Sequence, residues 1–238
     1  MLDRMAHRPS PRLPRYFPSA ELADEEGLLV VGGALDPDVL LDAYRHGIFP
    51  WPIDDVSPLL WFSPDPRALI ELDGLHVSRR LARTIRSGRF NATCDQAFAD
   101  VMKGCATAPG RRGGTWITPT MRRAYTRLHR LGHAHSVEVW RDGELAGGVY
   151  GVAIGGLFAA ESMFHRETDA SKVALAALVG HLNRRGYQLL DVQQWNEHTG
   201  SMGAIEAPRA EYLRRLAVAV EAPVTFGDTL EGAVDPRP

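Results

Sequence analysis

HSVEVWRDGELAGGVYGVAIGGLFAAESMF (residues 135–164) contains three runs of strand-forming residues separated by two short turns. Residues 135–140 alternate between polar and apolar side chains, and the runs 145–153 and 157–164 are mostly apolar. The turns are RDG at 141–143 and IGG at 154–156, and connections this short join antiparallel neighbours. The stretch therefore predicts a three-stranded antiparallel meander.

The residues that follow predict a helix and one more strand. Residues 170–185 carry an apolar helical stripe that includes Val173, Leu178 and Leu182, and Gly186 ends it. Residues 187–194 have the composition of a strand. In its order of elements this region resembles the core of the acetyltransferase-like acyl-transfer fold, which is an analogy of topology alone.

The N-terminal part differs in composition. Asp36 and Pro37 are typical of a helix start, and the apolar stripe behind them ends at Gly47. The proline- and aromatic-rich residues 48–67 cannot form one regular element. We expect an α+β protein with a small N-terminal α/β domain and disordered leader (1–65), an acetyltransferase-like (GNAT-type) mixed-sheet domain (66–222) and a C-terminal tail (223–238).

Cysteine use and hydropathy indicate a reducing compartment. Cys94 and Cys105 are the two cysteines and form no CxxC pair, so neither a disulfide scaffold nor a zinc ribbon is supported. The basic leader has no apolar run that could be a secretory signal, and no run of about 18 apolar residues predicts a membrane span. We expect a cytoplasmic monomer without a membrane partner.

Basic residues gather in two acid-free stretches, although the net charge is −2. Helices are predicted over residues 78–86 and 119–131, the second with Thr118 as its cap, and arginines at i, i+4 and i+7 share one side of each. For one such helix, a solvated face is the favoured interpretation. Two together favour a polyanionic partner docking on one face of the molecule. The arginines assigned to phosphate binding are Arg79, Arg80, Arg83, Arg86, Arg123, Arg127 and Arg130.

Two acids lie inside predicted strands, where Asp and Glu are depleted. Alternation places Glu161 on the same face as Met163, and Asp191 on the same face as Gln193. Each acid alone could occupy an edge position or pair with a nearby arginine. On neighbouring strands of one sheet, however, two carboxylates indicate a functional site.

Cofactor motifs are missing where this topology would need them. CoA-dependent enzymes of the fold carry a glycine-rich loop between the third strand and the helix, but residues 162–172 (SMFHRETDASK) contain no glycine. The sequence has no Walker loop either. The histidines at 129, 133 and 135 have no acid or cysteine that completes a metal site. We therefore expect no cofactor and no metal, and an acyl donor that arrives already activated.

Several blocks, taken in order, resemble the leucyl/phenylalanyl-tRNA–protein transferase family. They include EEGLLVVGGALDPDVLLDAYRHGIFPW (25–51), LWFSPDPR (60–67), HVSRRLAR (76–83), TWITPTM (115–121), GGVYGVAIGGLFAAESMF (147–164), ASKVAL (170–175) and LLDVQ (189–193). The resemblance extends from about Tyr16 to Leu216. It implies transfer of leucine or phenylalanine, with methionine as a further candidate, from aminoacyl-tRNA to proteins that begin with Arg or Lys, as an N-end rule degradation tag.

The resemblance also implies roles for individual residues. Asp191 and Gln193 match the proposed catalytic pair, and Glu161 matches the other carboxylate of the site. Trp51 and Trp116 match aromatic residues around the terminal adenosine and the entrance. The implied apolar side-chain pocket consists of Val149, Met163, Leu175, Leu178, Leu182 and Leu190.

Two rival functions stay open. One is an acyltransferase of the same fold that uses CoA or a cell-wall precursor, against which the missing loop argues. The other is a tRNA-binding protein without catalysis, which leaves the acids inside the sheet unexplained. The chain also departs from the family pattern at Ala160, where the family has glycine, so the relative use of Leu, Phe and Met stays open.

Overall fold

The computed structural model describes residues 14–108 and 115–231. Most of the expected disordered leader and the end of the expected C-terminal tail lie outside these residues. None of the helices in the described ranges combines the length and the hydropathy that crossing a bilayer requires.

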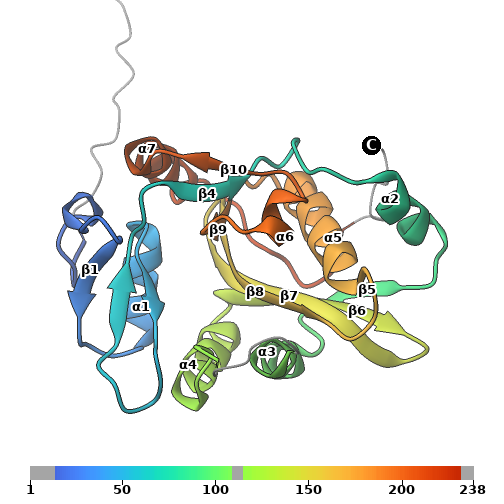
Figure 1. Cartoon of the computed structure of the whole chain (residues 1–238), viewed down its shortest axis with the longest axis horizontal. Helices are drawn as coiled ribbons and strands as arrows, with labels where there is room; N and C mark the ends of the chain where they lie inside the picture. The colour runs from blue at the N-terminus through green and yellow to red at the C-terminus, as the bar shows by residue number, and fades with distance from the viewer. Residues whose placement is uncertain (1–13, 109–114, 232–238) are drawn as a thin grey trace, which may run out of the picture.

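A mixed seven-stranded sheet forms the centre of the described chain (Figure 1). Its order is β10-β4-β9-β8-β7-β6-β5; β8 and β9 run parallel, and the other neighbours run antiparallel. The predicted meander is β6-β7-β8, and α5 (Ala170–Arg185) connects it to β9, so the expected mixed-sheet α+β fold is confirmed. The strands are β4 (Arg67–Ile70), β5 (Asn91–Cys94), β6 (Ala134–Arg141), β7 (Glu144–Ile154), β8 (Leu157–His165), β9 (Leu189–Gln193) and β10 (Ala204–Ala207).

Helices cover both faces of this sheet. α5 and α2 (Arg79–Arg86) pack on one face, and α3 (Phe98–Thr107) and α4 (Pro119–Arg130) pack on the other (Figure 1). Ser78 caps α2 and Thr118 caps α4, because each side chain accepts a hydrogen bond from a backbone N–H of the first turn. Gly186 ends α5 in the left-handed conformation, with a φ of 81°.

A smaller three-stranded sheet forms the N-terminal part. Its order is β1-β3-β2, with β1 (Leu28–Val31), β2 (Phe49–Trp51) and β3 (Leu60–Phe62) beside α1 (Pro37–Arg45) and a short 3-10 helix, η1 (Ala20–Leu22). Tyr44 and Phe49 share one hydrophobic cluster with Met121 and Tyr125 of the larger part. The two parts therefore pack through a common core, and the domain boundary near residue 65 stays a prediction.

The C-terminal elements close the sheet at its β10 end. They are α6 (Glu197–Gly200), β10 and α7 (Arg209–Ala219), and Tyr212 of α7 packs against Leu69 and Leu189. Residues 223–231, expected as part of a tail, pack back on the protein. Phe226 is buried and its ring contacts those of His135 and His181.

Strand β8 contains a bulge that changes the expected faces. Tyr150 pairs with Ser162 and Gly151 pairs with Ala160, so Glu161 is the extra residue. Met163 packs on the α5 side of the sheet, whereas the side chain of Glu161 meets the tyrosines of the α1 and α4 side. The expectation that Glu161 and Met163 share a face is therefore wrong, because the extra residue interrupts the alternation.

Candidate functional site

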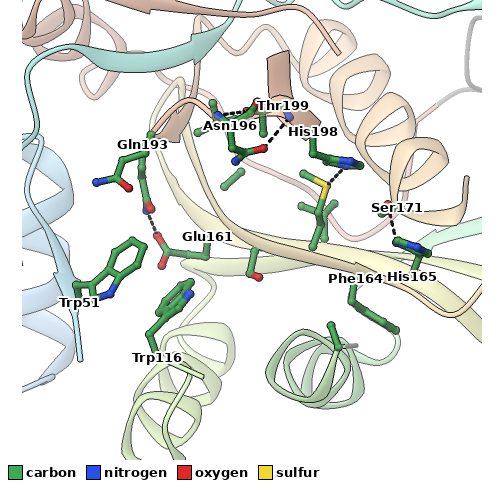
Figure 2. A pocket seen from close by; sticks show the side chains of 17 residues that line it. Trp51, Trp116, Glu161, Phe164, His165, Ser171, Gln193, Asn196, His198 and Thr199 are labelled. Carbon is green, nitrogen blue, oxygen red and sulfur yellow. Dashed lines mark hydrogen bonds between the residues drawn. The ribbon is translucent and has the colours of Figure 1, made fainter. Parts of the chain in front are cut away.

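The parallel strands β8 and β9 pair over a short length and then separate. Residues 157–159 of β8 pair with residues 189–191 of β9, and the strands continue beyond this register as two walls of a cavity of about 460 Å³ (Figure 2). Trp51 and Trp116 line one end of the cavity, and Ser171 and His198 line the other. Ligands commonly bind at the carboxyl ends of parallel strands, so this opening is the candidate site.

Asp191 lies behind the cavity and is completely buried. Arg67 of β4 donates to it twice, from Nε to Oδ1 at 2.9 Å and from Nη2 to Oδ2 at 2.6 Å. Tyr212 donates its hydroxyl to Oδ2 at 2.8 Å, and Arg67 Nη1 also donates to the Gly47 carbonyl at 3.0 Å. Both oxygens of Asp191 are thus occupied within a two-bond ion pair, so this carboxylate is suited to positioning its neighbours.

Gln193 connects Asp191 to the cavity. Its backbone N–H donates to Asp191 Oδ1 at 2.8 Å, and its φ is 65°. A non-glycine residue pays roughly 1–2 kcal/mol for this left-handed conformation, which persists where the surroundings hold it. The side chain turns towards β8, where Nε2 donates to Glu161 Oε1 at 2.5 Å (Figure 2). One N–H of the amide is committed to Glu161, so the carbonyl oxygen and the second N–H are the groups that Gln193 can offer to a ligand.

Glu161 is the second carboxylate and is 8% exposed. The hydroxyl of Tyr44 donates to Oε1 at 2.7 Å, the hydroxyl of Tyr125 donates to Oε2 at 3.4 Å, and the two hydroxyls contact each other. Its hydrogen-bond partners in the described part of the chain are therefore all neutral. Burial raises the pKa of Glu161 to about 7, although the hydrogen bond from Tyr44 works in the opposite direction. Its charge can therefore change near neutral pH.

Trp51 and Trp116 meet at one end of the cavity. Their ring centroids are 5.3 Å apart and the rings are inclined by 22°, which is direct stacking contact. A third ring does not fit between them at this separation.

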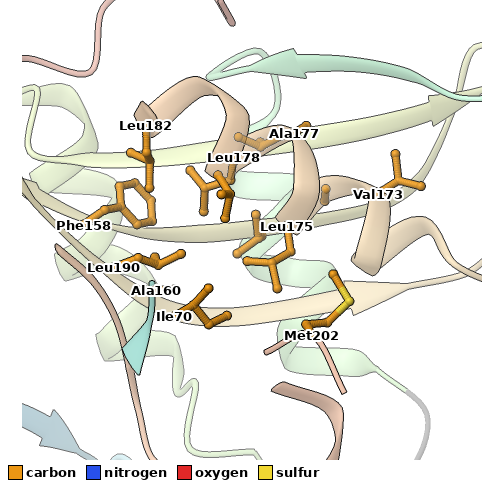
Figure 3. Close-up of a cluster of buried hydrophobic side chains, with 14 of the residues drawn as sticks. Ile70, Phe158, Ala160, Val173, Leu175, Ala177, Leu178, Leu182, Leu190 and Met202 are labelled. Atoms are coloured by element: carbon orange, nitrogen blue, oxygen red, sulfur yellow. The ribbon is translucent and has the colours of Figure 1, made fainter. Parts of the chain in front are cut away.

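Only two of the six residues expected to form the apolar side-chain pocket line this cavity. Val149 and Met163 line it, together with Ala160. The other expected residues are fully buried in the cluster between α5 and the sheet (Figure 3); they are Leu175, Leu178, Leu182 and Leu190. An inward-facing helical stripe builds core whether or not a ligand binds beside it, so the sequence pattern alone could not separate the two groups.

The predicted phosphate-binding arginines are all exposed, but they do not form one surface. Those of α2 lie on the α5 side of the sheet and those of α4 lie on the opposite side (Figure 1). The expectation that both arginine stripes bind a polyanion on one face of the molecule is therefore wrong, because α2 and α4 lie on opposite sides of the sheet. The residues concerned are Arg79, Arg80, Arg83, Arg86, Arg123, Arg127 and Arg130.

The N-terminus of α5 carries a carboxylate where a CoA-dependent enzyme would hold its pyrophosphate. Asp169 is the residue before α5 and has a φ of 70°. Arg80 lies 3.3 Å from its Oδ2, and Thr84 donates to the same oxygen at 3.3 Å. A negative side chain here opposes the binding of an anion that would otherwise be favoured at a helix N-terminus.

Sequence reasoning missed the residues that hold the two carboxylates. Tyr44 and Tyr125 fall on the apolar faces of predicted helices, and Arg67 and Tyr212 lie in elements that were not predicted. The available signal was the tyrosine hydroxyl itself, since a buried tyrosine usually needs a hydrogen-bond partner. Tyr44, Tyr125, Tyr212 and Arg67 are each at most 1% exposed.

Known proteins match most of this chain in sequence. A family model described as leucyl/phenylalanyl-tRNA protein transferase matches residues 69–217, and the model of that family's N-terminal domain matches residues 33–65. A leucyl/phenylalanyl-tRNA–protein transferase of Solidesulfovibrio magneticus is 55% identical over 206 residues, which cover 86% of this chain and 83% of that protein. Another from an Anaeromyxobacter species is 53% identical over 220 residues, covering 91% and 93%. Among solved structures, L-PGS from Bacillus licheniformis has a TM-score of 0.41 at 11% identity, covering 60% of this chain and 46% of that one.

Proposed function

The chain belongs to the leucyl/phenylalanyl-tRNA protein transferase family, and from this membership we propose that it moves leucine or phenylalanine from aminoacyl-tRNA to the N-terminal amine of proteins that begin with Arg or Lys. The amine attacks the ester carbonyl, a peptide bond forms, and the ribose hydroxyl of the tRNA leaves. Because the ester is already activated, the site has to position two substrates rather than activate one. The product carries an N-end rule degradation tag in the cytoplasm, and the enzyme acts as a monomer without a metal or cofactor.

The observation that carries this proposal is the carboxylate of Glu161, which lines the cavity without an ion-pair partner in the described residues. A guanidinium or ammonium group of the acceptor's first residue supplies the missing opposite charge. Its arrival lowers the pKa of Glu161 and keeps the carboxyl ionised in the complex. The preference for Arg and Lys at the acceptor's N-terminus follows from this pairing.

Gln193 and Asp191 act on the attacking amine. The carbonyl oxygen of Gln193 accepts a hydrogen bond from the amine, and Asp191 fixes Gln193 through its backbone N–H. An α-amino group has a pKa near 8, so a useful fraction is neutral at cellular pH. A strong base is not required, and Asp191 serves as a positioning residue.

The donor RNA is held without reading its sequence. The outer side of the Trp51–Trp116 pair stacks the terminal adenine, and exposed arginines of α2 and α4 contact phosphates. The aminoacyl side chain lies against Val149, Ala160 and Met163, with the buried leucines of the α5 layer behind them. The methyl group of Ala160 then influences the relative use of Leu, Phe and Met.

Transfer of labelled leucine from leucyl-tRNA to an Arg-initiated peptide tests the proposal. We expect label in the peptide, and none after the RNA has been digested with ribonuclease. Turnover of an acyl-CoA without tRNA would instead identify the CoA-dependent rival. Binding of tRNA without transfer would identify the non-catalytic one.

A neutral copy of the acceptor tests the role of Glu161. Citrulline has nearly the shape of arginine but no charge, so the wild-type enzyme is expected to prefer the Arg-initiated peptide by roughly tenfold or more in kcat/KM. Glu161→Gln should lose this preference. Equal preference in both enzymes would remove Glu161 from acceptor recognition.

A further inference from the structure

Trp195 is an exposed aromatic residue that does not itself line the cavity but stands between two residues that do. It lies in the loop from β9 to α6, and its neighbours Gln194 and Asn196 both line the cavity. The residue is 49% exposed. A Cβ added to Gly200 of α6 would lie 2.5 to 2.8 Å from three atoms of the indole, so the ring rests against the backbone at that glycine. One part of the ring is thus supported by α6 while the rest faces solvent.

Beyond the contact between Trp195 and Gly200, the surface carries basic side chains. Gly200 also lines a second cavity of about 430 Å³, whose wall includes Lys172, His76 and Ser78. Lys172 donates to Ser201 at 3.2 Å across this cavity. Ser78 is the cap of α2, so the exposed arginines of that helix begin directly beyond it. Cationic groups therefore lead from the region of Trp195 to α2.

Charge alone does not explain an indole at this position. Glu197 is exposed in the first turn of α6, two residues after Trp195, and it weakens any attraction of phosphate to the ring's immediate surroundings. A flat uncharged partner is attracted to an indole irrespective of that acid. Nucleobases are such partners, and stacking on an aromatic side chain tolerates any base.

We propose that Trp195 stacks the base that immediately precedes the terminal adenosine of the donor RNA. The inference rests on the proposed function, which stacks the terminal adenine on the Trp51–Trp116 pair at one end of the cavity and sets its ester beside Gln193. The single strand must then leave through the mouth, where Trp195 offers the exposed ring. Beyond it, Lys172 and the arginines of α2 carry the backbone away, so α2 rather than α4 is the helix that the RNA meets first.

Donors of increasing length test this subsite. The donors are phenylalanyl-adenosine, phenylalanyl-cytidylyl-adenosine and phenylalanyl-tRNA, each assayed with an Arg-initiated peptide. In the wild type the second nucleotide is expected to raise kcat/KM roughly tenfold. In Trp195→Ala this ratio between the two short donors should fall to about one, and Trp195→Phe should keep most of it because a ring remains.

A matched control separates stacking from general loss of surface. Leu131, at the end of α4 on the opposite side of the sheet, is 55% exposed, and Leu131→Ala should keep the wild-type ratio. A Trp195→Ala enzyme that keeps the tenfold ratio overturns the proposal. So does one whose KM for the acceptor peptide rises with every donor, because Trp195 would then contact the acceptor. Absence of transfer from all three donors by the wild type would instead remove the proposed function.

Discussion

The two buried carboxylates of the site lie on neighbouring strands, yet their partners are of opposite kinds. Asp191 is 0% exposed and is paired with Arg67, whereas Glu161 is 8% exposed and is held by two hydroxyls and an amide. Burial is nearly the same in both, so the partner decides the behaviour. Asp191 is a fixed anion that anchors the backbone of Gln193, and Glu161 has a pKa raised by burial to about 7.

This difference divides the work of the site. A carboxylate that already has a buried cation gains little from a second one, because its oxygens are occupied. A carboxylate with neutral partners gains much when a cation arrives, since the cation removes the cost of its burial. Gln193 bonds to both acids, through its backbone to Asp191 and through its side chain to Glu161. An arriving acceptor therefore meets Glu161, whose charge can respond to it, and Glu161 is held in place through Gln193 by the ion-paired Asp191.

The largest effect is expected from breaking the ion pair between Arg67 and Asp191. Asp191→Asn leaves the buried guanidinium of Arg67 without its opposite charge, which costs about 3–5 kcal/mol in the free energy of unfolding. Turnover should fall at least roughly tenfold, because Gln193 loses its fixed position. Urea unfolding and the transfer assay measure the two effects.

Glu71 provides the matched control for this variant. It forms a similar two-bond pair with Arg215 at 2.7 Å, but these side chains are 37% and 29% exposed. Glu71→Gln should therefore cost less than about 1 kcal/mol. If the two variants lose equal stability, burial does not make the Arg67–Asp191 pair special.

The raised pKa of Glu161 predicts that the stability of the protein depends on pH. The pKa of Glu161 is about 7 in the folded protein and near 4.5 in the unfolded chain. Between these values the folded state keeps a proton that the unfolded state has released, so stability falls as the pH rises from 4.5 to 7 and is then constant. The total loss is about 3 kcal/mol, and Glu161→Gln should lack it.

Urea unfolding of both proteins at pH 5 and pH 8 measures this contribution. Other titrating groups are common to the two, so their effects cancel in the difference between wild type and Glu161→Gln. That difference should change in favour of the variant at pH 8. A difference that is the same at both pH values would show that the carboxyl is not perturbed by burial.

Elements with local chemical signals were predictable from the sequence. Thr118 caps α4 as expected, Gly186 ends α5, and the short turns at 141–143 and 154–156 define the meander. Each of these features depends on residues a few positions apart. Asp36 is a partial exception: it precedes α1 as expected, but its side chain makes no capping hydrogen bond.

Features that depend on distant pairing were not predictable. β4 is a four-residue strand that is buried throughout, so it lacks the alternation of a half-exposed strand, and its place is set by pairing with β9 and β10. Arg67 on β4 meets Asp191 across 124 positions of sequence. The bulge at Glu161 depends on the register with β7, where a Cβ on Gly151 would lie 2.3 Å from the Ala159 carbonyl oxygen. Asp191 and Glu161 could be singled out from the sequence, but the buried cation beside the first and the neutral hydroxyls beside the second could not be predicted.

The smallest effect is expected from trimming the hydroxyls around Glu161. Tyr44 donates at 2.7 Å and lowers the pKa of this carboxyl, whereas Tyr125 lies 3.4 Å away from it. Tyr44→Phe removes about 1 kcal/mol of this stabilisation of the anion, which raises the pKa of Glu161 by about one unit. Because the proposed role requires the ionised form, the acid limb of the pH dependence of kcat/KM for an Arg-initiated peptide should move to higher pH. Tyr125→Phe should move the acid limb less, since its longer contact with Glu161 contributes less. A larger shift from Tyr125→Phe than from Tyr44→Phe would contradict this. The two hydroxyls would then act on Glu161 as one unit through their mutual contact.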